Sequence, residues 1–167
     1  MRPFIVMLAG TLTALAACSS GEPAPARAAQ APAAGKARLC DVVTKAEVEQ
    51  AVGRPVTAMA PLHAAHPDLS CKIEFAPDTS LELSIGTTFK DPGIATSAAL
   101  AELMKTSTFP EGLDWRPLEG LARPAAELAD GPIITIQKGP ARLQLTSFAI
   151  PLEATRAVAR HAATRMP

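Results

Sequence analysis

Histidine, carboxylate and cysteine side chains are the groups in this sequence with the chemistry to build a site. His63 and His66 lie close together, and Asp68 follows them. Imidazole and carboxylate are ligands that Zn²⁺ and Cu²⁺ accept. A metal centre also needs a third firm ligand and a second shell of hydrogen bonds, and these residues lie in a proline-containing segment with neither evident. Solvated loop histidines are therefore expected, and the sequence predicts no metal and no other cofactor.

A short apolar stretch near the amino terminus ends in a cysteine. It runs from Phe4 to Ala14, follows Arg2, and reaches Leu15-Ala16-Ala17-Cys18. A transmembrane helix needs about 20 apolar residues, so the stretch is too short to be one and instead has signal-peptide anatomy. Its last four residues resemble a bacterial lipobox. The resemblance implies a signal peptide over residues 1–17 and lipid on Cys18, in preference to an ordinary secretory peptide with an incidental cysteine.

The lipobox resemblance also implies a location. Each buried CH₂ contributes about 0.8 kcal/mol, so the two or three acyl chains of a lipoprotein make a stable membrane anchor. The residue after the cysteine is Ser19 and not Asp. In an envelope with two membranes, this resembles the signal of lipoproteins that are sorted to the outer membrane. We therefore expect an exported protein, lipid-anchored in the cell envelope, on the periplasmic face of the outer membrane if the source has two membranes.

If lipid occupies Cys18, Cys40 and Cys71 remain with one possible pairing. The compartment is oxidising, and closing a loop of about 30 residues removes denatured-state entropy equivalent to roughly 3.6 kcal/mol. A reactive thiol pair is the alternative, but the two residues have no C-x-x-C spacing and no evident activating base. The sequence predicts a structural disulfide.

Composition argues against several classes of function. Lys plus Arg and Asp plus Glu both number 16, so no net field attracts a phosphate backbone, and nucleic acid is not an expected partner. Aromatic residues make up 4% with no Tyr, which removes the usual stacking platforms for bases and sugars. No G-x-S-x-G, Gly-rich phosphate loop or H-E-x-x-H motif occurs, so no catalytic residue can be named.

The chain after the predicted signal peptide has two regions of different amino-acid composition. Residues 18–38 are rich in Ala and Pro and predict an extended tether, and residues 39–167 predict a single α+β domain. The first helix begins with a capping box, Thr44-Lys45-Ala46-Glu47, and ends at Gly53. A second helix is expected over 94–105, and a third from Pro151, with Arg156 and Arg160 outside and with Arg160, His161 and Arg165 favouring the helix dipole.

Period-two alternation and turn residues predict the strands. They are expected over 56–62, 71–75, 81–85, 133–137 and 141–148, with a short strand around Trp115 inside a connection over 108–124. These strands should form one or more antiparallel sheets packed by the three helices. The order of a helix followed by strands occurs twice, which suggests two similar halves.

A family resemblance covers the region after the tether. Its residues are Leu39-Cys40-Asp41-Val42-Val43-Thr44, Ala46-Glu47-Val48, Gly53, Cys71 and Leu118-Glu119-Gly120-Leu121. The pattern resembles small uncharacterised lipoproteins best known from actinobacteria, which carry a C-x-L-L-T-x-x-E-V helix opening. This chain has Val42-Val43 in place of the usual leucines, and Ala122-Arg123 after the later motif. The resemblance implies the fold and the Cys40–Cys71 pairing, but no activity.

A membrane anchor, an extended tether and a disulfide-stabilised domain are together typical of a protein that presents a binding domain at a membrane surface. We therefore expect a non-enzymatic envelope lipoprotein that binds an envelope protein or a small ligand. The alternative is an envelope enzyme whose catalytic residues are dispersed in the sequence. A deep pocket with converging ionisable groups would favour the enzyme, whereas an uncovered sheet face or an exposed apolar patch would favour binding.

Overall fold

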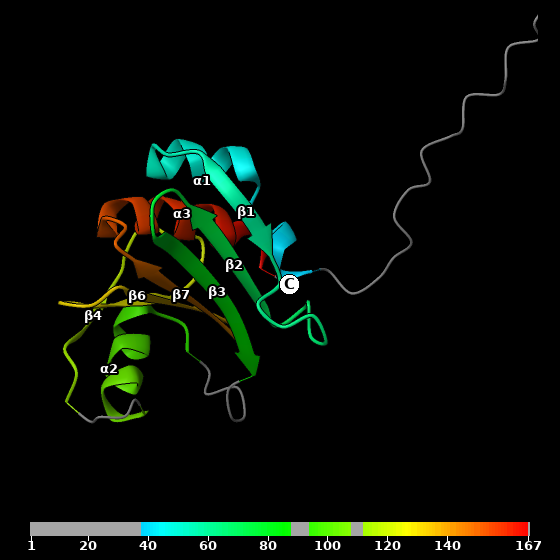
Figure 1. The fold of residues 1–167 in the computed structure, drawn as a ribbon. Helices are drawn as coiled ribbons and strands as arrows, with labels where there is room; N and C mark the ends of the chain where they lie inside the picture. Colours follow the sequence, from blue (N-terminus) through cyan, green and yellow to red (C-terminus); the bar gives the residue numbers. More distant parts are fainter. Residues whose placement is uncertain (1–37, 88–93, 108–111, 167) are drawn as a thin grey trace, which may run out of the picture. The chain divides into compact units, whose positions relative to one another are not determined.

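The computed structural model describes residues 38–87, 94–107 and 112–166 (Figure 1). The predicted signal peptide, Cys18 and all but the last residue of the predicted tether lie outside this range. The described residues form three α-helices and one seven-stranded antiparallel sheet, which confirms the α+β class. The helices are α1 (Lys45–Val52), α2 (Ser97–Ser107) and α3 (Leu152–Arg165), with a 3-10 helix η1 (Leu39–Val42) before them. The strands are β1 (Val56–Ala60), β2 (Ser70–Phe75), β3 (Thr79–Thr87), β4 (Trp115–Pro117), β5 (Ala125–Leu128), β6 (Ile133–Lys138) and β7 (Ala141–Phe148).

The sheet consists of two meanders joined at their last strands. Its order is β1-β2-β3-β7-β6-β5-β4, so each meander begins at an edge and ends at the centre. The two centre strands pair antiparallel from Ser80 with Phe148 to Thr87 with Ala141. A helix precedes each meander, α1 before β1 and α2 before β4, so the expected repetition of a helix followed by strands is present in the element order.

The main core lies between one face of the sheet and the pair of helices α1 and α3, which Figure 1 shows on the same side. Ile73, Leu83 and Leu145 project from β2, β3 and β7 into this core and are fully buried. On α3, Ala159 and Ala162 are also fully buried, because small side chains let the helix approach the sheet closely. The strand alternation seen in the sequence therefore marks the face that packs against α1 and α3.

A smaller core occupies part of the opposite face, where α2 packs on β4 and β5. Leu100 and Met104 of α2 meet Trp115 and Ala126 there, and Trp115 is 1% exposed. The rest of that face, over β1, β2, β3 and β7, carries mainly polar side chains. One half of this face is thus buried, and the other half is open.

Local signals at α1 act as predicted. The Thr44 side chain accepts a hydrogen bond from the Glu47 backbone N–H, and the Glu47 carboxylate accepts one from the Thr44 backbone N–H. Gly53 ends the helix with φ of 71°, a left-handed conformation that glycine adopts at little cost. The capping box and the glycine stop are therefore both confirmed.

Several boundaries and one strand differ from the expectation. The first strand ends at Ala60, the strand expected over 81–85 is β3 (Thr79–Thr87), and α2 spans Ser97–Ser107. Pro151 is the N-cap of α3, one residue before the first helical position. Strand β5 was not predicted. Its sequence, Ala-Ala-Glu-Leu, shows no period-two pattern, because α3 and α2 cover its two faces and consecutive residues Ala125 and Ala126 are both buried.

Within the described ranges, the helices include none with the length and apolarity needed to cross a bilayer.

Candidate functional site

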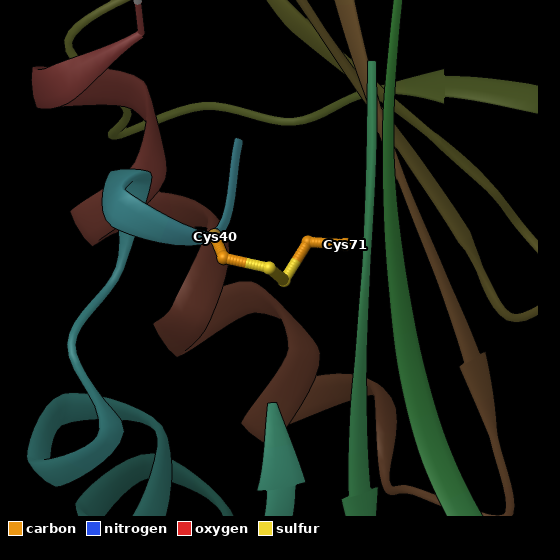
Figure 2. Close-up of a disulfide and its surroundings, with 2 residues drawn as sticks. All are labelled: Cys40 and Cys71. Carbon is orange, nitrogen blue, oxygen red and sulfur yellow. A yellow bond between two sulfur atoms is a disulfide. The ribbon is translucent and has the colours of Figure 1, made fainter. Parts of the chain in front are cut away.

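The two cysteines of the domain form a disulfide between η1 and β2 (Figure 2). The Cys40 and Cys71 sulfurs lie 2.04 Å apart, and the Cα atoms lie 5.1 Å apart. Cys71 is fully buried, and Cys40 is partly buried against the main core. Because a buried disulfide is poorly accessible to thiols in solution, this environment favours a structural bond over a reactive pair.

The weak metal candidates lie together in the loop that connects β1 to β2. His63 and His66 are exposed and form a turn in which the His66 backbone N–H donates to the His63 carbonyl at 3.0 Å. Asp68 is partly buried two residues further on. Among the described residues, the structure brings together no group of three His, Cys, Asp or Glu side chains able to hold a metal ion. The loop therefore offers two solvated imidazoles.

The Glu47 carboxylate joins the start of α1 to the end of α3. Besides its bonds with Thr44, it accepts hydrogen bonds from both terminal guanidinium nitrogens of Arg165, each at 2.6 Å. His161 Nδ1 lies 3.4 Å from one of its oxygens. The hydrogen bonds from Arg165, and next those from Thr44, hold the pKa of Glu47 far below its usual range. Arg165 and His161, expected only to favour the helix dipole, thus have a specific partner.

A second ion pair ties α3 to the sheet and corrects the expected position of Arg156. This side chain does not point into solvent: it is 25% exposed and binds Glu127 of β5 through Nε at 2.7 Å and a terminal nitrogen at 2.5 Å. Its other terminal nitrogen donates to Glu153. The apolar stem of an arginine lets its head reach from the flank of a helix to a neighbouring strand. Arg160 is exposed, as expected.

The open part of the sheet bears a polar cluster over β3, β7 and β6, which we call the open-face cluster. It consists of two cross-strand rows, Gly86–Arg142–Gln137 and Ser84–Gln144–Thr135. Residues directly opposite each other in a sheet share a face, so all six lie on the face that α2 covers only in part. Neither row contains an acidic residue.

Two shallow grooves lie elsewhere on the surface. One, of about 380 Å³, is lined by residues of β2, β3 and their turn, including Lys72, Glu74 and Asp78. The other, of about 410 Å³, lies at the start of α2 and includes Thr96, Glu119 and Arg123. Within the part of the chain that the structure describes, no hydrogen bond is found between a hydroxyl group and a carboxylate of either groove. Both grooves are open to solvent, which suits them less well to enclosing a substrate.

Comparison of the chain with known protein families, with curated proteins and with solved structures finds no match. The fold and the local chemistry therefore carry the functional argument alone.

The open-face cluster was missed in the sequence. Arg142 lies at an outward position of an alternating strand, where a charged residue is ordinary. Only the pairing register places Gly86 on one side of it and Gln137 on the other. The Glu127–Arg156 pair was missed for a similar reason, because it joins a helix to a strand that the sequence did not predict.

Proposed function

We propose that this protein is a lipid-anchored envelope lipoprotein whose α+β domain is a non-enzymatic binding module. Lipid on Cys18 would hold it at the membrane, and residues 18–38 would be the tether between anchor and domain. The ligand is an envelope protein or a small molecule. The proposed location is the periplasmic face of the outer membrane where the source has two membranes.

The observation that carries the binding function is the half-covered sheet. Helix α2 covers β4 and β5, and the same face of β3 and β7 has no helix packed on it in the described structure. A sheet face without its own helix can accept a ligand without rearrangement of the core. Disulfide and ion pairs anchor the opposite side of the domain, so the open face is presented on a fixed scaffold.

Site-specific photo-crosslinking in living cells tests this proposal. A photoreactive amino acid replaces Ser84, which is exposed in the middle of the open face, and in a control protein it replaces Arg160, which is exposed on α3. A discrete adduct from position 84 that is absent from position 160 is the expected result. Equal adducts from both positions, or none from position 84, would contradict an open-face binding function.

A further inference from the structure

Arg142 is held in an unusual electrostatic state at the centre of the sheet. It lies on β7, the middle strand, and is partly buried. Its Nε atom is buried and has no hydrogen-bond partner, and no carboxylate of the described residues pairs with its guanidinium. Burial lowers the pKa of Arg142, as expected for a cation removed from water without a counter-charge.

The other arginines make the contrast clear. Arg116, Arg156 and Arg165 each bind a carboxylate of the chain. Arg123 and Arg160, for which no ion pair is found among the described residues, are exposed to water. Arg142 is the one arginine of the described ranges that is partly buried and lacks a carboxylate. An unpaired charge taken out of water destabilises the fold, so its retention points to a partner outside the described residues, and a bound ligand is the partner that we consider.

The neighbours of Arg142 leave room for such a partner. Gly86 lies directly opposite on β3, and a Cβ atom built there would meet no atom within 4 Å. Thr135 is a diagonal neighbour on β6, at roughly 7 Å by ordinary sheet geometry, and is fully buried. Its Oγ1 has no hydrogen-bond partner in the described structure.

Repulsive charge is absent from the cluster. The nearest acidic residue on this face of β3 is Glu82, which lies opposite Thr146, one row beyond Ser84. Glu82 also faces Lys72 across β2 and β3, so a cation is already close to it. The open-face cluster therefore combines one uncompensated cation, two hydroxyl groups and free space.

We infer that the open-face cluster is an oxyanion site, in which Arg142 binds the carboxylate or phosphate group of a small ligand beside Gly86. The guanidinium fork matches both groups and donates two parallel hydrogen bonds to either. Ser84 would add a hydroxyl donor from the open side, and Thr135 would add one from the side toward α2. This inference rests on the proposed binding function and deepens it by naming the charge of the ligand.

Two anions serve as probes, inorganic phosphate and succinate. Each is titrated into the mature chain, purified in the form in which cells produce it, at constant ionic strength set with sodium chloride. The Nε–Hε resonance of Arg142 is followed by NMR, and the melting temperature is measured in parallel. We expect a saturable shift and a higher melting temperature with at least one probe. A response to phosphate alone identifies a phosphate ligand, and a response to succinate alone identifies a carboxylate.

Arg142→Gln lacks the resonance that is followed, so its readout is the melting temperature, which neither probe should raise. Arg160→Gln, which removes an exposed arginine elsewhere, should leave both the shift and the rise in melting temperature unchanged. No saturable response of the unmodified chain to either probe, or an unchanged rise in the melting temperature of Arg142→Gln, would overturn the inference. The titrations use a chain in which Ser84 is intact, and an adduct from position 84 reports a partner on the open face even where neither anion binds Arg142, so a failed oxyanion site is distinguishable from a failed binding face.

Stability without any probe gives a further test. Arg142→Met keeps a similar length and removes the charge. If Arg142 serves a ligand, the melting temperature of this variant should equal or exceed that of the unmodified chain. A clearly lower melting temperature would show that the chain itself satisfies Arg142, and would also overturn the inference.

Discussion

Arg165 donates a hydrogen bond of 2.6 Å to each carboxylate oxygen of Glu47. Arg165 lies in the last turn of α3, and Glu47 lies in the first turn of α1. The two residues are 118 positions apart in the chain. Glu47 thus has two tasks: it completes the capping box of its own helix and holds the end of the last helix against it. The contact is exposed, so its contribution to stability is modest and sensitive to salt.

Glu47→Gln should lower the melting temperature at neutral pH, because the neutral amide cannot make the charge-assisted fork with Arg165. The folded-state pKa of Glu47 is depressed, so the carboxylate stabilises the fold above its unfolded pKa of about 4.3 and loses this effect as pH falls toward the folded value. The difference in melting temperature between the two proteins should therefore narrow as the pH falls below about 4. Thermal unfolding over this range measures it, and a difference that grows below about pH 4 would contradict the assignment.

Removing the disulfide should destabilise the domain. The double variant Cys40→Ala and Cys71→Ala frees a loop with a sequence separation of 31, for which chain entropy predicts a loss of roughly 3.6 kcal/mol. Urea unfolding of this variant and of the oxidised chain gives the difference in the free energy of unfolding. Cys18 stays intact in both proteins, so any lipid on it is the same in both. Equal stabilities, or mass spectrometry that finds Cys40 and Cys71 as free thiols in protein isolated from cells, would refute the bond.

The two carboxylates around Arg156 provide a matched comparison. The Glu127 side chain is 9% exposed and that of Glu153 is 75% exposed. Glu127→Gln should cost about 1.5–3 kcal/mol, because it weakens a charge-assisted pair shielded from water. Glu153→Gln should cost less than about 1 kcal/mol. Urea unfolding of both variants tests the order, and a larger loss for Glu153→Gln would reverse our view of which residue ties α3 to the sheet.

Cys18→Ser should release the protein from membranes, because a hydroxyl cannot take the place of the thiol as the acceptor of lipid in a lipobox. Fractionation of cells that express each form measures the membrane-bound share after a high-salt wash. The disulfide double variant, which keeps Cys18, is the control and should stay with the membrane. A Cys18→Ser protein that still sediments with membranes would mean that another element anchors the chain.

Helix α1 and strand β5 show which parts of the fold can be predicted from the sequence and which cannot. The capping box and Gly53 are signals within a few residues, and local backbone chemistry is enough to place α1. Alternation likewise identified β2, β3, β6 and β7, because one side of each packs in the main core. Strand β5 has no such contrast, since Ala125 and Ala126 are buried on opposite faces. Its existence depends on α2 and α3, which only the tertiary fold brings to it.

The contacts of the candidate site also include some that could be predicted from the sequence and some that depend on the tertiary fold. The Cys40–Cys71 bond could be predicted because few thiols leave few pairings. The isolation of Arg142 could not, because it depends on which residues of two other strands lie beside it, and pairing register is not visible in one strand alone. The partners of Arg156 and Arg165 are similarly long-range.

The central pairing of β3 with β7 also constrains the order of folding. Leu83 and Leu145, partners in this pair, are about sixty residues apart, and β7 is the last strand of the chain. During synthesis from the amino terminus, the first meander emerges with β3 as an unpaired edge strand, and this edge stays unpaired until residues 141–148 have been made. The main core closes only when α3 follows, so the domain completes its fold late, after nearly the whole chain has been made.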